Sequence, residues 1–318
     1  MLASMDPLRY LVEARGFFTR AEAREFGYDD KTMARAVRLK IWHRIRRGTY
    51  TFTDIWTELD AENRHRVRAA AVLRSLGTKV ALSHVSGVLE WGIPTWGLDL
   101  SRVHVTRLDG GAGRIEGDVV HHEGVSLDHE VIERDGHLVL IPERCVLEAG
   151  SRARLPAARL VIVDGLLRMG LCTPERLDEQ FKLMERWPFM QSMHLPVRMG
   201  DGAAGSVGES LGRHLFWVNH IPAPQLQYKV HDSAGSMIGI CDWGWPDDGV
   251  LGEFDGQFKY GRLLKPGQEP GEVVFAEKQR EDLIREATDC RMIRIIWRDY
   301  DRPQLTARRV RAKLRRIS

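Results

Sequence analysis

Acidic side chains recur in the last third of the chain, at the ends of segments with strand-like patterns. The segment "GEFDGQFKY", residues 252–260, places Glu253 and Asp255 on either side of a phenylalanine. On a strand, residues two apart leave the same face, so both carboxylates would point the same way. The strand-like "SMIGICDWGW" before it carries Asp242, and the helix-like "SVGESLGRHLFWVN" carries Glu209 near its start. Neighbouring elements can bring such positions close together.

Carboxylates gathered in this way form an oxygen-ligand set that suits Mg²⁺ or Mn²⁺, bound as one or two ions. Such an ion can activate water and neutralise the charge that develops on an attacked phosphodiester. Without a cation the acids would repel one another, and the pKa of at least one would rise. We therefore expect Asp242, Glu253 and Asp255 to be catalytic and metal-ligating, with Glu209 as a further ligand. The alternative is a strand that simply ends in a solvated turn.

The elements that would position these acids follow a definite order from residue 206 onward. The pattern predicts a helix, three strands, a Gly/Pro-rich loop, a helix over about 274–287 and the apolar strand "RMIRIIW". This order, with an acid-ended strand followed by "GEFDG", resembles the PD-(D/E)xK nuclease superfamily, in particular its very-short-patch-repair-like endonucleases. The resemblance covers about residues 206–297 and implies a restriction-endonuclease-like αβββαβ core. It assigns Asp242 and Glu253 as the first and second metal ligands and Glu209 as the helix acid.

The chain departs from that superfamily pattern at two positions. Gly252 replaces the usual apolar residue before the glutamate, and Asp255 stands where the superfamily most often has a lysine. That lysine helps to orient or deprotonate the attacking water. Lys259 or Lys278 could supply the cation instead, because position in space matters more than sequence spacing. Both lysines are therefore candidate catalytic residues.

The N-terminal segment "GFFTRAEAREFGYDDKTMARAVRLKIWHRIRRGTYTF", residues 16–52, predicts a helix, a turn, a second helix and a hairpin. Thr19 can cap the first helix, which would end at Gly27. Asp30 can cap the second, which would begin at Lys31. Three apolar residues of the second helix recur at helical spacing and should face the core: Met33, Val37 and Ile41.

A basic surface remains on the other side of that second helix and on the hairpin. A helix of this size fits a DNA major groove, and the hairpin arginines could hold phosphates beside it. The alternative is a solvated basic face with no ligand. The candidate DNA-binding residues are Lys31, Arg35, Arg38, Lys40, Arg44, Arg46 and Arg47.

The order G-F-F-T-R-x-x-A, a glycine, a basic helix and an "I-x-R-G-x-Y" hairpin resembles the N-terminal winged helix-turn-helix of AbiEi-type antitoxins and related actinobacterial proteins. The resemblance covers about the first fifty residues. In that family the domain binds operator DNA and represses its own operon. The resemblance therefore implies DNA contact through residues 31–40 and a nucleotidyltransferase-like toxin as partner.

The middle of the chain predicts a mixed α/β module similar to the central part of AbiEi-like proteins. Ser83, His84 and Ser86 lie in one short segment, but no acid is identifiable beside them, so a hydrogen-bonded structural histidine is the preferred interpretation. His121 and His122 are adjacent, and on a strand they would point to opposite faces and could not share a metal. We assign neither a role from the sequence.

Composition bounds the remaining possibilities. The 318 residues are 43% hydrophobic, carry a net charge of +3 and include four scattered cysteines, which are expected to be buried or free thiols. No apolar run is long enough to span a membrane and the N-terminus lacks an apolar signal core, so a cytoplasmic location is expected. The expected fold class is a multidomain α+β and α/β protein. Its expected domains are a winged helix-turn-helix (1–56), a mixed α/β module (57–200) and a nuclease-like domain with a basic C-terminal helix (201–318).

Two classes of function follow from these patterns. In the first, a winged helix delivers a metal-dependent endonuclease to DNA. In the second, the protein is a non-catalytic AbiEi-like antitoxin and repressor of a type IV toxin–antitoxin operon, whose C-terminal fold serves for dimerisation or partner contact. Both require DNA binding, and only the first requires the carboxylates to work. The target sequence and the oligomeric state do not follow from the sequence.

Overall fold

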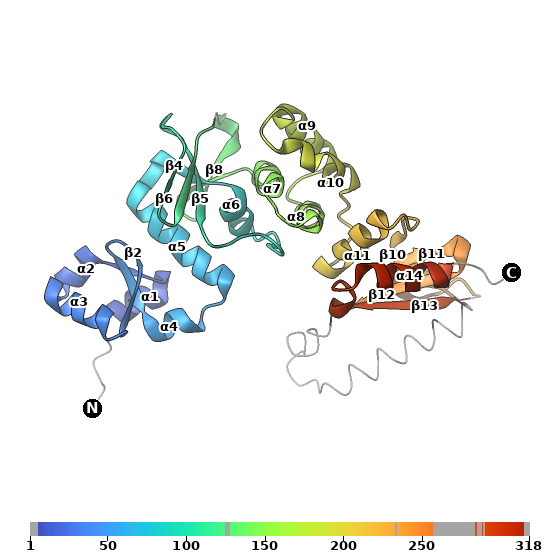
Figure 1. Ribbon diagram of the computed structural model, residues 1–318, viewed down its shortest axis with the longest axis horizontal. Helices are drawn as coiled ribbons and strands as arrows, with labels where there is room; N and C mark the ends of the chain where they lie inside the picture. The colour runs from blue at the N-terminus through green and yellow to red at the C-terminus, as the bar shows by residue number, and fades with distance from the viewer. Residues whose placement is uncertain are drawn as a thin grey trace. The chain divides into compact units, whose positions relative to one another are not determined.

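A computed structural model of the chain describes residues 6–124, 128–232, 234–256, 284, 288 and 290–314 (Figure 1). Contacts divide the chain into two compact units, Met1–Leu155 with Arg176–His194, and Pro156–Glu175 with Leu195–Ser318. The described residues form a mixed α/β protein with a three-, a six- and a four-stranded sheet. The coarse fold class expected from the sequence is therefore confirmed. Within the described residues, no helix combines the length and the apolar character that crossing a membrane requires.

The N-terminal part of the first unit contains three helices and a three-stranded antiparallel sheet in the order β1-β3-β2. Its small core is built around packed aromatic rings, with Phe18 and Trp42 edge to face and 4.7 Å apart between ring centroids. The elements are α1 (Pro7–Arg15), β1 (Phe18–Thr19), α2 (Arg20–Glu25), α3 (Asp30–Arg38), β2 (Trp42–Arg46) and β3 (Thr49–Phe52).

Local contacts confirm the predicted start of α2 and correct that of α3. The Thr19 hydroxyl accepts the Glu22 N–H and the Glu22 carboxylate accepts the Thr19 N–H, which is a complete capping box. The prediction that Asp30 caps α3 is wrong: Asp29 is the cap and accepts the Thr32 N–H at 2.7 Å. Asp30 is already helical, and its carboxylate instead receives hydrogen bonds from two arginines of α2, Arg20 and Arg24.

The end of α3 also differs from the prediction. The helix ends at Arg38, and Lys40 beyond it has a positive φ of 56°. Helical spacing therefore no longer applies to Ile41, which is 53% exposed instead of facing the core. Met33 is buried and Val37 packs against the same core, as expected.

The rest of the first unit is built on a six-stranded mixed sheet in the order β6-β7-β5-β4-β9-β8. Strands β5 and β7 are parallel, as are β4 and β9, while the other neighbours are antiparallel. The strands are β4 (Val80–Leu82), β5 (Val103–Arg107), β6 (Arg114–Glu116), β7 (Val119–His122), β8 (Val131–Arg134) and β9 (His137–Leu140). The α-helices that follow the hairpin are α4 (Thr53–Glu58), α5 (Ala61–Leu76), α6 (His84–Glu90), α7 (Pro142–Ser151) and α9 (Pro174–Met184).

The second unit is built on a four-stranded sheet in the order β10-β11-β12-β13, in which β12 and β13 are parallel. Helices α11 and α14 cover one face of this sheet with a shared apolar core. The three strands and the later strand expected from the sequence are all present, and the expected helix over about 274–287 falls outside the described residues except for Ile284. The strands are β10 (Gln225–His231), β11 (Met237–Trp245), β12 (Val250–Asp255) and β13 (Arg291–Ile296). The helices are α8 (Pro156–Arg168), α10 (His194–Met199), α11 (Val207–Val218) and α14 (Pro303–Leu314).

Glu22 provides a test of the N-terminal fold through its charge. Burial alone would raise the pKa of Glu22, but hydrogen bonds from Arg15 and from the Thr19 N–H lower it to about 2. Because the folded pKa lies below the unfolded value of 4.5, the carboxylate stabilises the fold above pH 4.5, and this stability is lost as the pH falls toward 2. We expect Glu22→Gln to lower the free energy of unfolding by about 1 kcal/mol at pH 7.

Urea unfolding at pH 7 and pH 3 measures this effect, which should be smaller at pH 3. Glu25→Gln is the matched control, because Glu25 is on the same helix and exposed. An equal loss for Glu22→Gln at both pH values would show that the carboxylate charge contributes nothing.

Candidate functional site

The pairing of β11 with β12 brings Asp242 next to the backbone of the "EFDG" segment. The last paired residues are Trp243 and Gly252, and just beyond this pair the Asp242 Oδ2 accepts the Phe254 N–H at 2.7 Å. The predicted first ligand and the strand that carries the predicted second ligand are therefore neighbours.

Glu209 approaches Asp242 from the first turn of α11. Its side chain is buried, and its Oε2 accepts hydrogen bonds from the Gly205 N–H at 2.8 Å and from Gln227 Nε2 at 3.0 Å. Burial, and next the charge of Asp242, raise the pKa of Glu209. The nearby Tyr300 hydroxyl donates to the Gly208 carbonyl at 2.6 Å, and burial together with neighbouring acids raises its pKa well above 10.0. These shifts are those expected where acids share a desolvated site.

Two glycines one helical turn apart allow α11 to lie this close to the sheet. A Cβ on Gly208 would come within 2.1 Å of the Phe254 ring, and a Cβ on Gly212 within 2.3 Å of the Trp243 ring. Any side chain at either position would push the helix away from the strands and carry Glu209 with it.

Gln227, whose side chain contacts Glu209, has a strained backbone conformation. It has a positive φ of 47° in the middle of β10, although a non-glycine residue rarely adopts this region. Its two strand neighbours, Leu226 and Tyr228, keep regular pairing with β11, opposite Trp243 and Cys241. The strain thus falls opposite Asp242 and turns the Gln227 amide toward Glu209. Strain of this kind persists only where surrounding contacts enforce it.

Glu253 and Asp255 lie beside a cation that the sequence did not indicate. Arg294 on β13 places one guanidinium nitrogen 4.0 Å from Glu253 Oε2 and another 3.9 Å from Asp255 Oδ2. The parallel register pairs Glu253 with Arg294, which no spacing along the chain could reveal. The Cys241 thiol lies 3.8 Å from the other oxygen of Glu253. Lys259 and Lys278, the predicted sources of this cation, fall outside the described residues, so their assignment stays a prediction.

The predicted DNA-binding residues lie at the surface of α3 and of the β2–β3 hairpin. All are exposed except Arg46, which is half-buried. Unlike Arg20 and Arg24 of α2, which pair with Asp30, the exposed ones form no ion pair with a described residue. They are Lys31, Arg35 and Arg38 on α3, Lys40 just after it, and Arg44 and Arg47 on the hairpin.

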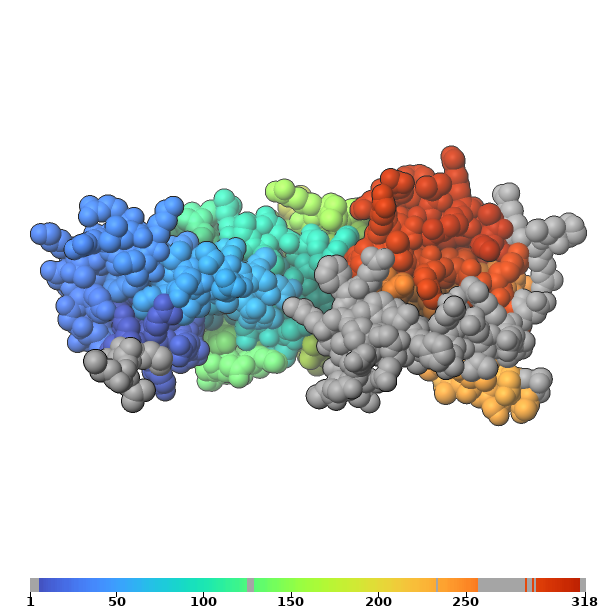
Figure 2. Space-filling model, turned by 90° about the horizontal axis from the view of Figure 1, so that it is seen from below, coloured from blue at the N-terminus to red at the C-terminus, as the bar shows by residue number. Residues whose placement is uncertain are grey.

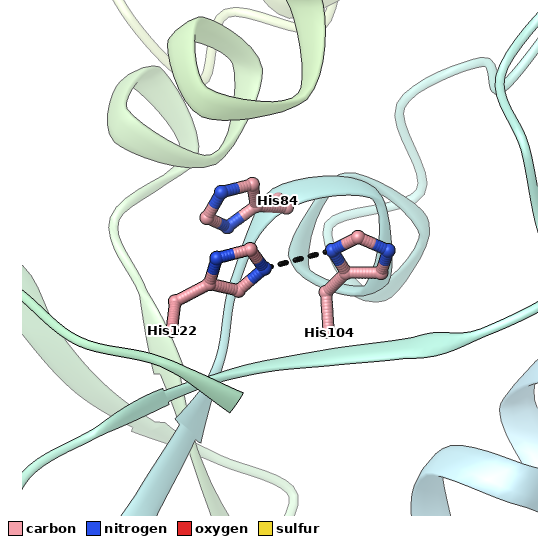
Figure 3. Close-up of side chains that lie close together, drawn as sticks. All are labelled: His84, His104 and His122. Atoms are coloured by element: carbon pink, nitrogen blue, oxygen red, sulfur yellow. Dashed lines mark hydrogen bonds between the residues drawn. The ribbon is translucent and has the colours of Figure 1, made fainter. Parts of the chain in front are cut away.

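Three histidines that had no role predicted from the sequence lie together in the first unit. His84 begins α6, His104 lies on β5 and His122 on β7, and one ring nitrogen of each lies within 4.8 Å of the others (Figure 3). His104 Nδ1 and His122 Nε2 are 2.9 Å apart, and the His84 and His122 rings stack at 3.6 Å between centroids. His121 takes no part, and its Nε2 lies 3.8 Å from Glu116.

The sequence interpretation of these histidines was incomplete. His121 and His122 do not share a site, as expected, but His122 has partners from two distant segments. An acid does lie beside His84: Glu148 of α7, 3.0 Å away. The parallel pairing of β5 with β7 sets His104 and His122 on neighbouring strands, and this pairing has no local sequence signal.

No family model matches the chain. It is similar to the uncharacterized proteins MT2308 and Rv2248 of two Mycobacterium tuberculosis strains, each 27% identical over 120 residues, or 38% of this chain and 44% of the relative. The chain thus spans less than half the length of these curated relatives. Among solved structures it is similar to the crystal structure of RV2827C protein from Mycobacterium tuberculosis, with a TM-score of 0.41 and 16% identity over 65% of this chain and 78% of that one.

Gly212→Ala tests the close approach of α11 to the sheet. Alanine normally stabilises a helix relative to glycine by about 1 kcal/mol. Here we expect a loss of about 1–3 kcal/mol in the free energy of unfolding, because the new methyl group meets Trp243.

The double variant Gly212→Ala/Trp243→Phe supplies the control, because phenylalanine lacks the indole atoms nearest to Gly212. Chemical denaturation of all four proteins gives a double-mutant cycle in which the alanine costs less beside phenylalanine. Stabilisation by Gly212→Ala alone would contradict the proposed contact.

Proposed function

We propose that the protein binds DNA through α3 and the β2–β3 hairpin. The observation that carries the proposal is the exposed set of basic residues on these two elements, which form no ion pair with any described acid. Positive charge without an intramolecular partner is available to phosphates, and it supplies most of the affinity of DNA-binding surfaces.

The shape of the region supports the same proposal. Three helices followed by a hairpin, with the sheet order β1-β3-β2, fit a winged helix-turn-helix. The nine residues of α3 form an α-helix, which with its side chains is about 10–12 Å across and therefore fits a major groove about 12 Å wide. Side chains of these N-terminal elements, blue in Figure 2, reach solvent on the face in view.

The acids of this region are positioned so that they do not neutralise α3. Asp30 is committed to Arg20 and Arg24 of α2, at 2.5 Å and 2.7 Å. Asp29 faces the helix N-terminus as its cap. The exposed Thr32 and Arg35 follow on the same helix and could contact base edges, with arginine suited to guanine.

Removing two arginines of α3 tests the proposal. We expect Arg35→Ala/Arg38→Ala to reduce the slope of log affinity against log salt by about 2, because each lost phosphate contact removes about one unit. Fluorescence anisotropy with a labelled duplex over a range of salt concentrations measures this slope.

Lys182→Ala is the matched control, since Lys182 is exposed, belongs to the same unit and pairs with Asp178. It should bind DNA as the parent does. Unchanged affinity and salt slope in the double arginine variant would refute binding through α3.

A second proposal concerns catalysis by the second unit. The buried Glu209 lies near the half-buried Asp242, the strained Gln227 donates to Glu209 from a position opposite Asp242, and the resemblance to PD-(D/E)xK nucleases supports hydrolysis of DNA phosphodiester bonds with Mg²⁺ or Mn²⁺. The alternative is an AbiEi-like antitoxin that represses its own operon together with a nucleotidyltransferase-like toxin. Under that alternative the acids have only a structural role.

Cleavage of supercoiled plasmid in Mg²⁺ or Mn²⁺ separates the two. We expect the parent to nick or linearise the plasmid, and Asp242→Ala or Glu253→Ala to lower the rate at least 100-fold, by analogy with the loss of a preorganised charge-stabilising group. Asp248→Ala, in the turn between β11 and β12, should cleave normally.

DNA affinity measured on the same proteins keeps the two proposals distinct. Tight binding by the parent without any cleavage would favour the repressor. Cleavage that survives both acid substitutions would point to a contaminating nuclease and remove the catalytic assignment.

A further inference from the structure

We propose that His84, His104 and His122 bind a zinc ion. The three imidazoles come from α6, β5 and β7, and one nitrogen of each lies within 4.8 Å of the others (Figure 3). Imidazole nitrogen is a preferred ligand of zinc, and three histidines with a fourth open position form a known type of zinc site. This inference is independent of the DNA-binding and nuclease proposals.

Two of the three nitrogens need only a small adjustment to bind one ion, whereas the His84 ring, stacked on His122 with 12° between the ring planes, must turn to direct its lone pair at that ion. Two nitrogens bound to one tetrahedral zinc, each at about 2.0–2.1 Å, lie about 3.3 Å apart. His104 Nδ1 and His122 Nε2 are 2.9 Å apart, so an ion between them requires them to separate by about 0.4 Å. The ion would replace the proton that these two nitrogens share.

Glu148 supplies the outer support that a histidine ligand usually has. Its Oε2 lies 3.0 Å from His84 Nδ1, so His84 offers its other nitrogen, Nε2, to the ion. The other oxygen of Glu148 accepts the Arg144 Nε–H at 3.0 Å, which fixes the carboxylate. A carboxylate that holds the far side of an imidazole orients the ring and increases its basicity as a ligand.

The backbone of His84 supports the same role. His84 has a positive φ of 49°, a strained conformation that aims its ring at His122.

A pocket of the first unit gives an ion a path to the group. Its volume is about 430 Å³, and His84 and His104 line it together with Arg102, Arg152 and Arg154. Solvent can thus reach His84 and His104, whereas the far side of His84 is closed by the buried Glu148.

Zinc uptake by the full chain tests the proposal. Protein stripped with a chelator is incubated with Zn²⁺, separated from free metal by gel filtration and measured by mass spectrometry of the metal. We expect one zinc per chain for the parent and for His121→Ala, whose imidazole lies outside the group. His104→Gln and His122→Gln should lose this zinc, and circular dichroism should confirm that both remain folded.

Glu148→Gln provides a second readout that does not depend on losing a ligand. Competition with a chromogenic chelator should show zinc affinity 10- to 100-fold weaker than that of the parent, as expected for removal of an outer-shell carboxylate. Tetrahedral visible absorption bands of the Co²⁺-loaded parent, absent from the folded His122→Gln variant, would agree. Absence of stoichiometric zinc in the parent, or undiminished zinc in the folded histidine variants, would overturn the proposal.

Discussion

The first unit depends on a charge buried at its centre. Arg144 of α7 is 1% exposed, and two acids, Glu130 and Glu148, bind its guanidinium. Removing either acid would leave the buried Arg144 guanidinium incompletely paired, and breaking a buried ion pair lowers the free energy of unfolding by about 3–5 kcal/mol. The arrangement therefore fixes α7 relative to the segment before β8, and it fixes Glu148 in place. Gly87 completes the geometry, because a Cβ there would lie 2.2 Å from Cys145 Sγ, so α6 can pack directly on α7 and bring His84 to Glu148.

In the second unit, close packing of a helix on the sheet likewise holds a buried carboxylate in place. Gly208 and Gly212 bring α11 onto the sheet, and Glu209, between them in the sequence, is carried to Asp242. In both units a glycine allows a helix to pack closely against a neighbouring element. This close packing brings a buried carboxylate, Glu148 or Glu209, next to its partner. The strained residues His84 and Gln227 lie at these two places. Because strain must be offset by surrounding contacts, its occurrence beside both buried carboxylates supports a role for each cluster beyond packing.

Local patterns in the sequence were sufficient to predict most helices and strands, but they were not sufficient to predict which side chains come together in the candidate sites. The Thr19 capping signal and the presence of four strands in the last third could be predicted, because caps, turns and alternation act over a few residues. The cap of α3 was misplaced by one residue, since two adjacent aspartates satisfy the same rule and only tertiary pairing with α2 distinguishes them. His122 and Arg294 could not be assigned, because each meets its partners through a parallel strand pairing that joins distant segments.

The pairing of arginines with acids explains how a chain with a net charge of only +3 can have a strongly basic surface on one helix and one hairpin. Several arginines of the first unit are held by acids: Arg15 by Glu22, Arg20 and Arg24 by Asp30, and Arg144 by Glu130 and Glu148. An acid that is paired in this way does not neutralise the positive charge of α3. A folded chain can therefore be nearly neutral overall while one helix and one hairpin keep their full positive charge. A nearby phosphate backbone interacts with this local charge and not with the net charge of the chain.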